Sequence, residues 1–253
     1  MTTQLLIYKQ AVPVSKDEHA DWSLKKEADY SFSQEVNSVP LLTTEFAKAS
    51  LEYPVVFVRT EDMVMPMVVF SVQAQQNLYV SETGEWLGKY IPAFIRRYPF
   101  VFSSTDDGKT LTLCIDEEYS GWNQEGRGER LFDSEKEQTQ YLNNVLDFLQ
   151  LYQAQFQYTG AFCEKLQELD LLEPMEAQFT TTNNQQESFG GFLGVSREKL
   201  KNISSEQLFS LMQSDWLELI YLHIQSLNHF SVLVEKSELP QTSELVEESG
   251  VVA

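Results

Sequence analysis

The feature that most constrains the fold is a change in hydrophobic period near residue 133. Before it, short β-rich runs alternate with turn residues. The runs 100–104 and 111–116, for example, flank Asp107-Gly108, a dipeptide favoured in hairpin turns. After it, apolar residues recur at alternating steps of three and four, the spacing of an amphipathic helix. These positions are Leu142, Val145, Leu149, Tyr152 and Phe156. The pattern predicts an α+β protein, with an antiparallel sheet and short helices in the N-terminal half and a helix-rich C-terminal half packed on it.

Proline residues and capping residues place the remaining element boundaries. In the N-terminal half we expect an edge strand ending at Pro13, a helix opened by Pro40 and stopped at Pro54, a strand over 55–59, a hairpin of 66–72 with 77–81, and a short helix between Pro92 and Pro99. In the C-terminal half we expect a helix capped by Ser134 and Glu137 and ended by Pro174, a strand near 175–182, a second strand or extended segment over 190–204, and a last helix capped by Ser204 or Ser205 with a break near 214–216.

The chain is long enough for a sizeable core, and its composition of 42% hydrophobic residues is that of a globular protein. We expect one folded domain over 1–237, sheet-rich over about 1–133 and helix-rich over about 134–237. Residues 238–253 are acidic, low in aromatic residues and interrupted by Pro240, so they are expected to form a disordered tail.

The net charge limits the classes of molecule that the protein is expected to bind. Lys and Arg number 18 against 38 Asp and Glu, a formal net charge of −20. Phosphate backbones and anionic membrane surfaces are repelled by such a chain, so we expect neither nucleic acid nor membrane insertion. No segment reads as a secretory signal or a transmembrane helix, which predicts a soluble, cytoplasmic protein.

The segment YIPAFIRRYPF, 90–100, places an arginine pair among aromatic residues. Neighbouring side chains on a short helix point about 100° apart, so Arg96 and Arg97 cannot both face the core. One interpretation is a fork that binds a carboxylate or phosphate; the other is a structural ion pair with stacking on Tyr90, Phe94 or Tyr98. The segment is the candidate binding site for a protein or peptide partner. One of the two arginines is expected to be structural and the other to take part in binding.

A second candidate is the acidic run Asp116, Glu117 and Glu118 at a predicted strand end. Such a cluster acts as acid and base only if its carboxylates converge in space; otherwise it is a solvated strand end. The histidines, His19, His223 and His229, lack metal-ligand spacing, and Cys114 and Cys163 form no CxxC pair, so we expect no metal and no cofactor and interpret both cysteines as buried.

Several unusual segments, taken in their order along the chain, resemble those of a known family. They are NSVPLLTTEFAKASLEYPVVF, YIPAFIRRYPF, LTLCIDEEYSG, LFD, LDFLQLYQAQFQYTGAFCEKLQELDLLEPM and LIYLHIQSL. Together they resemble the SapC family of bacterial proteins from about Leu5 to Val234. That family is named for gene clusters of surface-layer (S-layer) proteins and their secretion, and relatives are often encoded beside halogenase-like proteins, cupin-like hydroxylases and TonB-dependent receptors. The resemblance implies an accessory role in surface-layer or outer-membrane receptor systems and supplies no catalytic residues.

Three functional hypotheses follow. The first is a non-enzymatic accessory protein that binds a protein or peptide partner through 90–100. The second is an enzyme, or an enzyme subunit working with halogenase-like or hydroxylase-like neighbours, that modifies a peptide or small molecule with the acidic run and an arginine; it requires a concave pocket. The third is a purely structural element whose aromatic segment is core.

Overall fold

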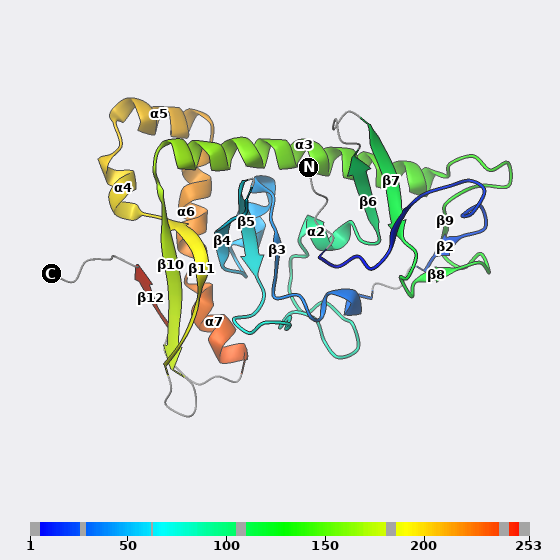
Figure 1. Cartoon of the computed structure of the whole chain (residues 1–253), viewed down its shortest axis with the longest axis horizontal. Helices are drawn as coiled ribbons and strands as arrows, with labels where there is room; N and C mark the ends of the chain where they lie inside the picture. Colours follow the sequence, from blue (N-terminus) through cyan, green and yellow to red (C-terminus); the bar gives the residue numbers. More distant parts are fainter. Residues whose placement is uncertain are drawn as a thin grey trace. The chain divides into compact units, whose positions relative to one another are not determined.

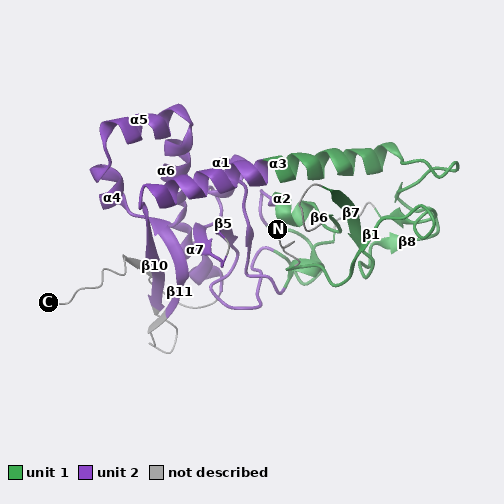
Figure 2. Cartoon of the chain, turned by 45° about the horizontal axis from the view of Figure 1, so that its top comes forward, with its two compact units in different colours: residues 1–34, 80–87, 93–154 green, residues 35–79, 88–92, 155–253 purple. Residues whose placement is uncertain are grey.

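The computed structural model describes residues 6–25, 29–61, 63–104, 110–180, 186–237 and 243–247. The chain forms two compact units (Figure 2): unit 1 comprises residues 1–34, 80–87 and 93–154, and unit 2 comprises 35–79, 88–92 and 155–253. Helices and antiparallel sheets occur together, so the predicted α+β class is confirmed. None of the described helices is long and apolar enough to cross a membrane.

Unit 1 contains two small sheets and the first part of a long helix (Figure 1). Its elements are β1 (Ala11–Pro13), β2 (Ser23–Leu24), η1 (Ser31–Ser33), α2 (Ala93–Arg96), β6 (Phe100–Ser104), β7 (Leu111–Asp116), β8 (Trp122–Asn123), β9 (Glu129–Arg130) and the start of α3 (Gln140–Glu168). The sheets have the strand orders β1-β7-β6 and β8-β2-β9.

Three predictions for unit 1 are confirmed. β6 and β7 pair antiparallel from Phe100 opposite Ile115 to Ser104 opposite Leu111, as the hairpin pattern predicts. The Asp107-Gly108 turn itself lies outside the described residues. β1 is an edge strand that ends at Pro13, where a missing N–H is tolerated. α2 lies between the two prolines expected to bound it.

The hydrophobic core of unit 1 joins its β strands to the start of α3. The buried residues are Phe100, Ile115, Leu131, Phe132, Leu142 and Leu149. Leu142 and Leu149 belong to the predicted helical stripe, so the 3.6-residue period identified the buried face of this helix correctly.

Unit 2 contains a six-stranded sheet and a group of C-terminal helices (Figure 1). Its elements are β3 (Ser38–Pro40), η2 (Thr43–Glu45), α1 (Phe46–Ala49), β4 (Val55–Arg59), β5 (Val64–Val69), the end of α3, β10 (Leu172–Thr180), β11 (Gln186–Val195), α4 (Arg197–Asn202), α5 (Ser205–Gln213), α6 (Trp216–Ser226), α7 (His229–Lys236) and β12 (Ser243–Glu247). The strand order is β12-β10-β11-β4-β5-β3, so the helix-rich C-terminal half also supplies strands to this sheet.

Two predictions for the N-terminal part of unit 2 are wrong. Pro40 does not open a helix: it ends β3, an edge strand paired with β5, where a proline is accommodated without loss of a ladder bond, and the helix begins only at Phe46. The hairpin of 66–72 with 77–81 does not form either. β5 pairs with β4 instead, and the second run contributes only the bridge between Val80 and Trp86.

The boundaries of α3 also differ from prediction. The helix starts at Gln140, because Asp133 accepts backbone hydrogen bonds from Glu135 and Glu137 and holds the preceding residues in a turn. It ends at Glu168, and Pro174 lies within β10. The predicted start of the helix is therefore too early and its predicted end too late. The helix ends before Pro174 because Leu172–Thr180 pairs with β11 as strand β10.

The strand or extended segment expected over 190–204 is wrong in its second part: 197–202 forms α4, because the Ser196 side chain accepts a hydrogen bond from Lys199 N and caps a helix there. The helix that follows agrees with the sequence signals. The hydroxyl of Ser204 accepts a hydrogen bond from Gln207 N at 3.1 Å and caps α5. The predicted break is at Asp215, whose φ of +60° separates α5 from α6. Of the segment expected to form a tail, the structure describes 243–247 as β12 beside β10; the rest lies outside the described residues.

A buried histidine bridges the centre of the six-stranded sheet. β11 and β4 pair through one position, Leu193 opposite Phe57. Beside it, His223 on α6 has its Nδ1 2.7 Å from Val55 O and accepts a hydrogen bond from Val195 N at its Nε2, at 3.0 Å. With the proton on Nδ1, the ring donates a hydrogen bond to β4 and accepts one from β11. Burial lowers the pKa of His223 to about 4, so the ring is neutral near pH 7.

Candidate functional site

The structure separates the roles of the two arginines. Arg97 is buried, and its guanidinium carbon lies 4.1 Å from the ring centroid of Phe94, 4.9 Å from that of Tyr152 and 5.7 Å from that of Tyr8. Such stacking on aromatic faces stabilises a desolvated cation. Arg97 is therefore part of the packing of unit 1, as the structural interpretation expects of one member of the pair.

Arg96 is the exposed member of the pair. Its guanidinium carbon lies 5.4 Å from the ring centroid of Phe148, and its charge also acts on the hydroxyl of Tyr30, whose pKa is raised by burial and lowered in part by this arginine. The last residue of α2 thus presents a cation at the surface of unit 1, next to an aromatic ring.

Asp116 is a structural carboxylate. It is fully buried at the end of β7 and accepts hydrogen bonds from the backbone N–H groups of Lys9 at 2.8 Å, Gln10 at 3.1 Å and Glu118 at 3.2 Å. The hydroxyl of Tyr98 donates a fourth at 3.1 Å. These four donors occupy the carboxylate oxygens and tie the N-terminal segment to β7, so Asp116 is not available as a proton acceptor.

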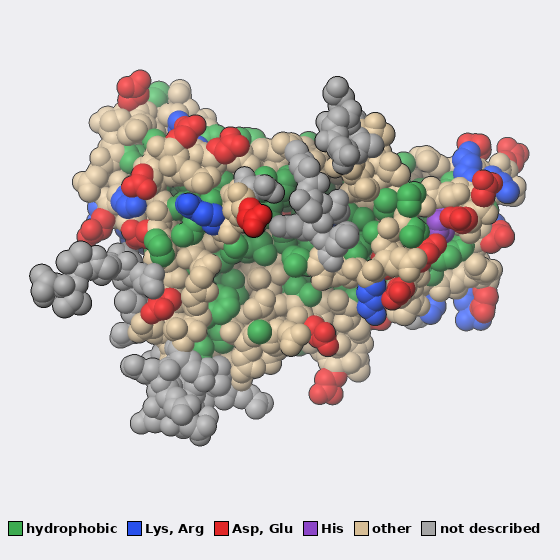
Figure 3. All heavy atoms as spheres, in the orientation of Figure 1, with side chains coloured by type: hydrophobic (Ala, Val, Ile, Leu, Met, Phe, Trp, Pro, Cys, Tyr) green, Lys and Arg blue, Asp and Glu red, His purple; other side chains and the backbone are tan. Residues whose placement is uncertain are grey.

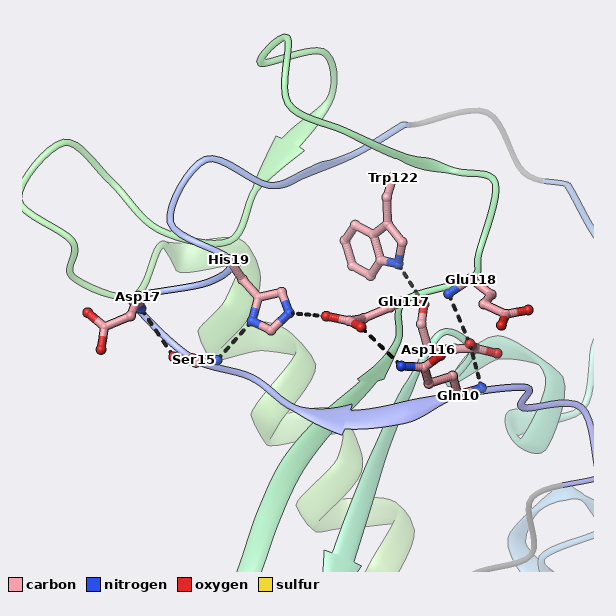
Figure 4. Close-up of polar contacts among 8 residues, drawn as sticks. All are labelled: Gln10, Ser15, Asp17, His19, Asp116, Glu117, Glu118 and Trp122. Carbon is pink, nitrogen blue, oxygen red and sulfur yellow. Dashed lines mark hydrogen bonds and ion pairs between the residues drawn. The ribbon is translucent and has the colours of Figure 1, made fainter.

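The neighbouring acids point in different directions (Figure 4). Glu117 accepts a hydrogen bond at 3.1 Å from Nε2 of His19, a fully buried ring whose Nδ1 accepts from Ser15 N at 3.0 Å. These contacts fix the tautomer and leave no ring nitrogen for a substrate. The Glu118 side chain is exposed, whereas Asp116 is fully buried. The three acids do not form a convergent acid–base set.

Tyr90 belongs to unit 2 and is held there as a structural residue. Its hydroxyl donates to the Glu45 carboxylate at 2.7 Å, and its backbone N–H donates to Glu52 at 2.9 Å. The hydroxyl of Tyr53 also donates to the carbonyl oxygen of Tyr90. The predicted site segment is thus divided: 90–92 anchors to unit 2, whereas 93–100 belongs to unit 1.

Tyr98 lies in a continuous aromatic array of unit 1. Its ring stacks on Phe32 at a centroid separation of 3.9 Å and meets Tyr119 edge-on at 5.0 Å. The array continues from Phe32 to Tyr30 at 6.2 Å, and from Tyr30 to Trp86 at 5.6 Å. All five rings are half-buried. Together with Arg96 they form what we term the aromatic surface: Tyr30, Phe32, Trp86, Tyr98, Tyr119 and Arg96.

The loops that carry these rings are firmly held. Asp29 accepts the backbone N–H of Ser31 at 2.9 Å. Gly84 has a φ of +82°, and a Cβ there would come within 2.3 Å of Asp29 Oδ1, so only glycine allows the two loops to approach. The Tyr98 hydroxyl is fixed by Asp116, and burial followed by the nearby carboxylate raises the pKa of Tyr98. Contacts within unit 1 therefore hold the loops of the aromatic surface in place before any binding partner is present.

Sequence reasoning found Tyr98 and Arg96 but missed Tyr30, Phe32, Trp86 and Tyr119. These residues lie on three other loops and share no motif with 90–100. The only sequence signal was the high aromatic content of 12%, which does not show which rings gather.

Metal and thiol chemistry find no support among the described residues. In that part of the chain, no group of three or more His, Cys, Asp or Glu side chains is placed to hold a metal ion. Cys114 and Cys163 are both buried and unpaired by a disulfide, as expected, and burial raises the pKa of Cys163 to about 12. Neither thiol is poised as a nucleophile.

These observations define an α+β protein whose most distinctive described surface is a rigid array of aromatic rings beside an exposed arginine. The chain belongs to the SapC family: the SapC family model matches residues 14–233 of its 253. Searches of curated proteins and of solved structures find no match.

Proposed function

We propose that this SapC-family protein is a non-enzymatic accessory protein that binds a protein or peptide partner through the aromatic surface of unit 1. The observation that carries the proposal is the gathering of half-buried Tyr, Trp and Phe rings beside exposed Arg96. Tyr, Trp and Arg are the residues in which binding energy concentrates at protein interfaces.

Two further features support binding rather than catalysis at this surface. The rings are already fixed by contacts within unit 1, so a partner would not have to order them, and little conformational entropy would be lost. The nearby acids are either saturated, as Asp116 is, or exposed and separate, as Glu118 is, which supports binding over the alternative of a peptide- or small-molecule-modifying enzyme.

The family resemblance supports the biological setting of this proposal. A partner encoded in the same gene cluster, belonging to a surface-layer or outer-membrane receptor system, fits an accessory protein that acts in the cytoplasm before its partner is exported. The direct partner of such a protein would be a protein or peptide.

Affinity purification from the source bacterium tests the proposal. We expect the tagged wild-type chain to recover a defined partner in constant ratio, and the double variant Trp86→Ala/Arg96→Ala to lose it. Phe209→Ala is the matched control, since Phe209 is a 53% exposed aromatic residue on α5 of unit 2. Equal recovery by wild type and the double variant, with both folded by circular dichroism, would contradict the proposal.

A further inference from the structure

One edge of the six-stranded sheet of unit 2 is covered by a strand from the C-terminal segment (Figure 1). β12 pairs antiparallel with β10 over Met175–Phe179, five of the nine residues of that strand. On its other side, β10 pairs with β11 from its first residue to its last. The pairing with β12 begins directly after Pro174, which has no N–H to donate. The stretch of β10 that pairs with β12 is therefore short and has a defined start.

β12 lies outside the part of the chain that matches the family. The SapC family model ends at residue 233, so β10 and β11 lie within the matched residues and β12 lies beyond them. Without β12, the backbone N–H and C=O groups of Met175–Phe179 that face it would lack a neighbouring strand, and such groups are a template for another extended backbone. The edge of β10 is thus a strand-binding site that this chain fills with its own segment.

The buried face of β10 indicates which side chain an added strand needs. Met175, Ala177 and Phe179 are buried, as alternate positions on one face of a sheet are. Residues directly opposite each other in an antiparallel pair project to the same face. Ala177 is the smallest of the three, so a large apolar residue opposite it would pack between the other two side chains. The register places Leu245 of β12 at this position.

The charge of the chain favours a different protein over a second copy as the occupant of this edge. Each copy has a formal charge of −20, and Figure 3 shows carboxylates at many separate points of the face it draws. Two such molecules repel each other, and β10 itself contributes Glu173 and Glu176. A protein of lower negative charge would approach this edge more readily than a second copy.

We propose that Met175–Phe179 binds an extended segment of a protein partner as an added antiparallel strand, with a large apolar residue opposite Ala177, and that β12 covers this edge until the partner displaces it. In this mode of recognition, main-chain hydrogen bonds supply the affinity and alternate side chains supply the specificity. Because β12 belongs to the same chain, it competes at an effective concentration of roughly millimolar. The edge belongs to unit 2, so the inference does not depend on the aromatic surface of unit 1.

Hydrogen exchange of the intact wild-type chain tests whether β12 opens by itself. We expect the backbone amides of β12 to exchange through local opening, and those that join β10 to β11 to exchange only when unit 2 unfolds. Exchange of β12 solely with global unfolding would overturn the inference, because no open edge would then be populated for a partner. Exchange as fast as in an unstructured peptide would overturn it too, because β12 would not cover the edge.

A labelled peptide of residues 241–249, QTSELVEES, probes the edge itself. Leu245→Pro/Val246→Pro in the full chain weakens the pairing of β12, because one of two adjacent N–H groups in a strand faces the neighbouring strand and proline has none. By fluorescence anisotropy, this variant should bind the peptide about tenfold more tightly than the wild type does. The control Val251→Pro/Val252→Pro, beyond β12, should bind it as the wild type does.

The remaining outcomes locate the site. The bound peptide should protect Met175–Phe179 from hydrogen exchange, and a peptide with Leu245→Asp should bind about tenfold more weakly. Equal binding to the wild type and the Leu245→Pro/Val246→Pro variant, no binding to either, or protection elsewhere would overturn the inference. Equal binding of the Leu245→Asp peptide would overturn the side-chain requirement.

The assignment to a different protein has its own test. In affinity purification, the Leu245→Pro/Val246→Pro variant should recover more of a partner than the wild type does, and an excess of the peptide QTSELVEES should release that partner. A recovered set of proteins that is unchanged, or that the peptide does not release, would overturn the assignment. Dimers of the variant in analytical ultracentrifugation that the peptide dissociates would do so as well, because the occupant would then be a second copy.

Discussion

His223 should make the protein lose stability in mild acid. The ring is fully buried in unit 2, and burial lowers its pKa from 6.5 to about 4. In the unfolded chain the ring binds a proton as the pH falls through 6.5, whereas in the folded chain it resists protonation until about pH 4. The unfolded state therefore gains protons first, and the free energy of unfolding falls with pH across this window.

The size of the effect follows from the two pKa values. Above about pH 7 both states are neutral and the contribution of His223 is constant; at about pH 5 the folded state has lost about 2 kcal/mol relative to about pH 7.5. The full loss, reached below pH 4, is about 3 kcal/mol. A protonated ring would also be unable to accept the hydrogen bond from Val195 N that joins β11 to α6.

Urea unfolding followed by circular dichroism at about pH 7.5, 6 and 5 measures this loss. His223→Gln is the matched variant, because an amide donates and accepts hydrogen bonds without titrating. We expect the wild type to lose about 2 kcal/mol more than the variant over this range. Equal losses in the two proteins, or an NMR titration of the His223 ring near its ordinary pKa, would refute the reasoning.

Three further outcomes are expected. Asp116→Asn should lower the free energy of unfolding by about 3 kcal/mol in urea, because an amide cannot accept all four hydrogen bonds that the buried carboxylate receives; a change within error would contradict its structural role. Gly128→Ala should destabilise unit 1, since its φ is +93° and a Cβ would meet Leu24 O at 1.9 Å; an unchanged melting temperature would oppose this. Cys163 should react with a thiol reagent only as the protein unfolds, because burial raises its pKa to about 12; rapid labelling of the native chain would show otherwise.

The sequence predicted elements whose signals are local. The hairpin of β6 and β7, the apolar stripe of α3, the Ser204 cap and the break at Asp215 all follow from residue type within a few positions, and the structure contains each of them. Predictions failed where pairing with a distant segment decided the outcome. Pro40 ends an edge strand because β5 lies beside it, and Pro174 lies in β10 because β11 pairs with that strand.

In the candidate site, too, local sequence predicted some features and contacts between distant segments decided the others. Position on a short helix was enough to predict that Arg96 and Arg97 have different environments. It could not predict which would be buried, because the rings that stack on Arg97 include Tyr8 and Tyr152, far away in the sequence. The contact of His19 with Glu117 spans 98 positions and has no local signature.

The amino-acid sequence by itself determined the α+β class, the strong negative charge and the positions of most helices and strands, because periodicity, caps and charge are properties of neighbouring residues. Only the tertiary structure decided that Asp116 is a saturated anchor and that Tyr30, Phe32, Trp86 and Tyr119 join Tyr98 in one surface. The physical reason is that burial and ring contacts depend on which loops the folded chain brings together, and several loops, none of which carries a motif, form this surface.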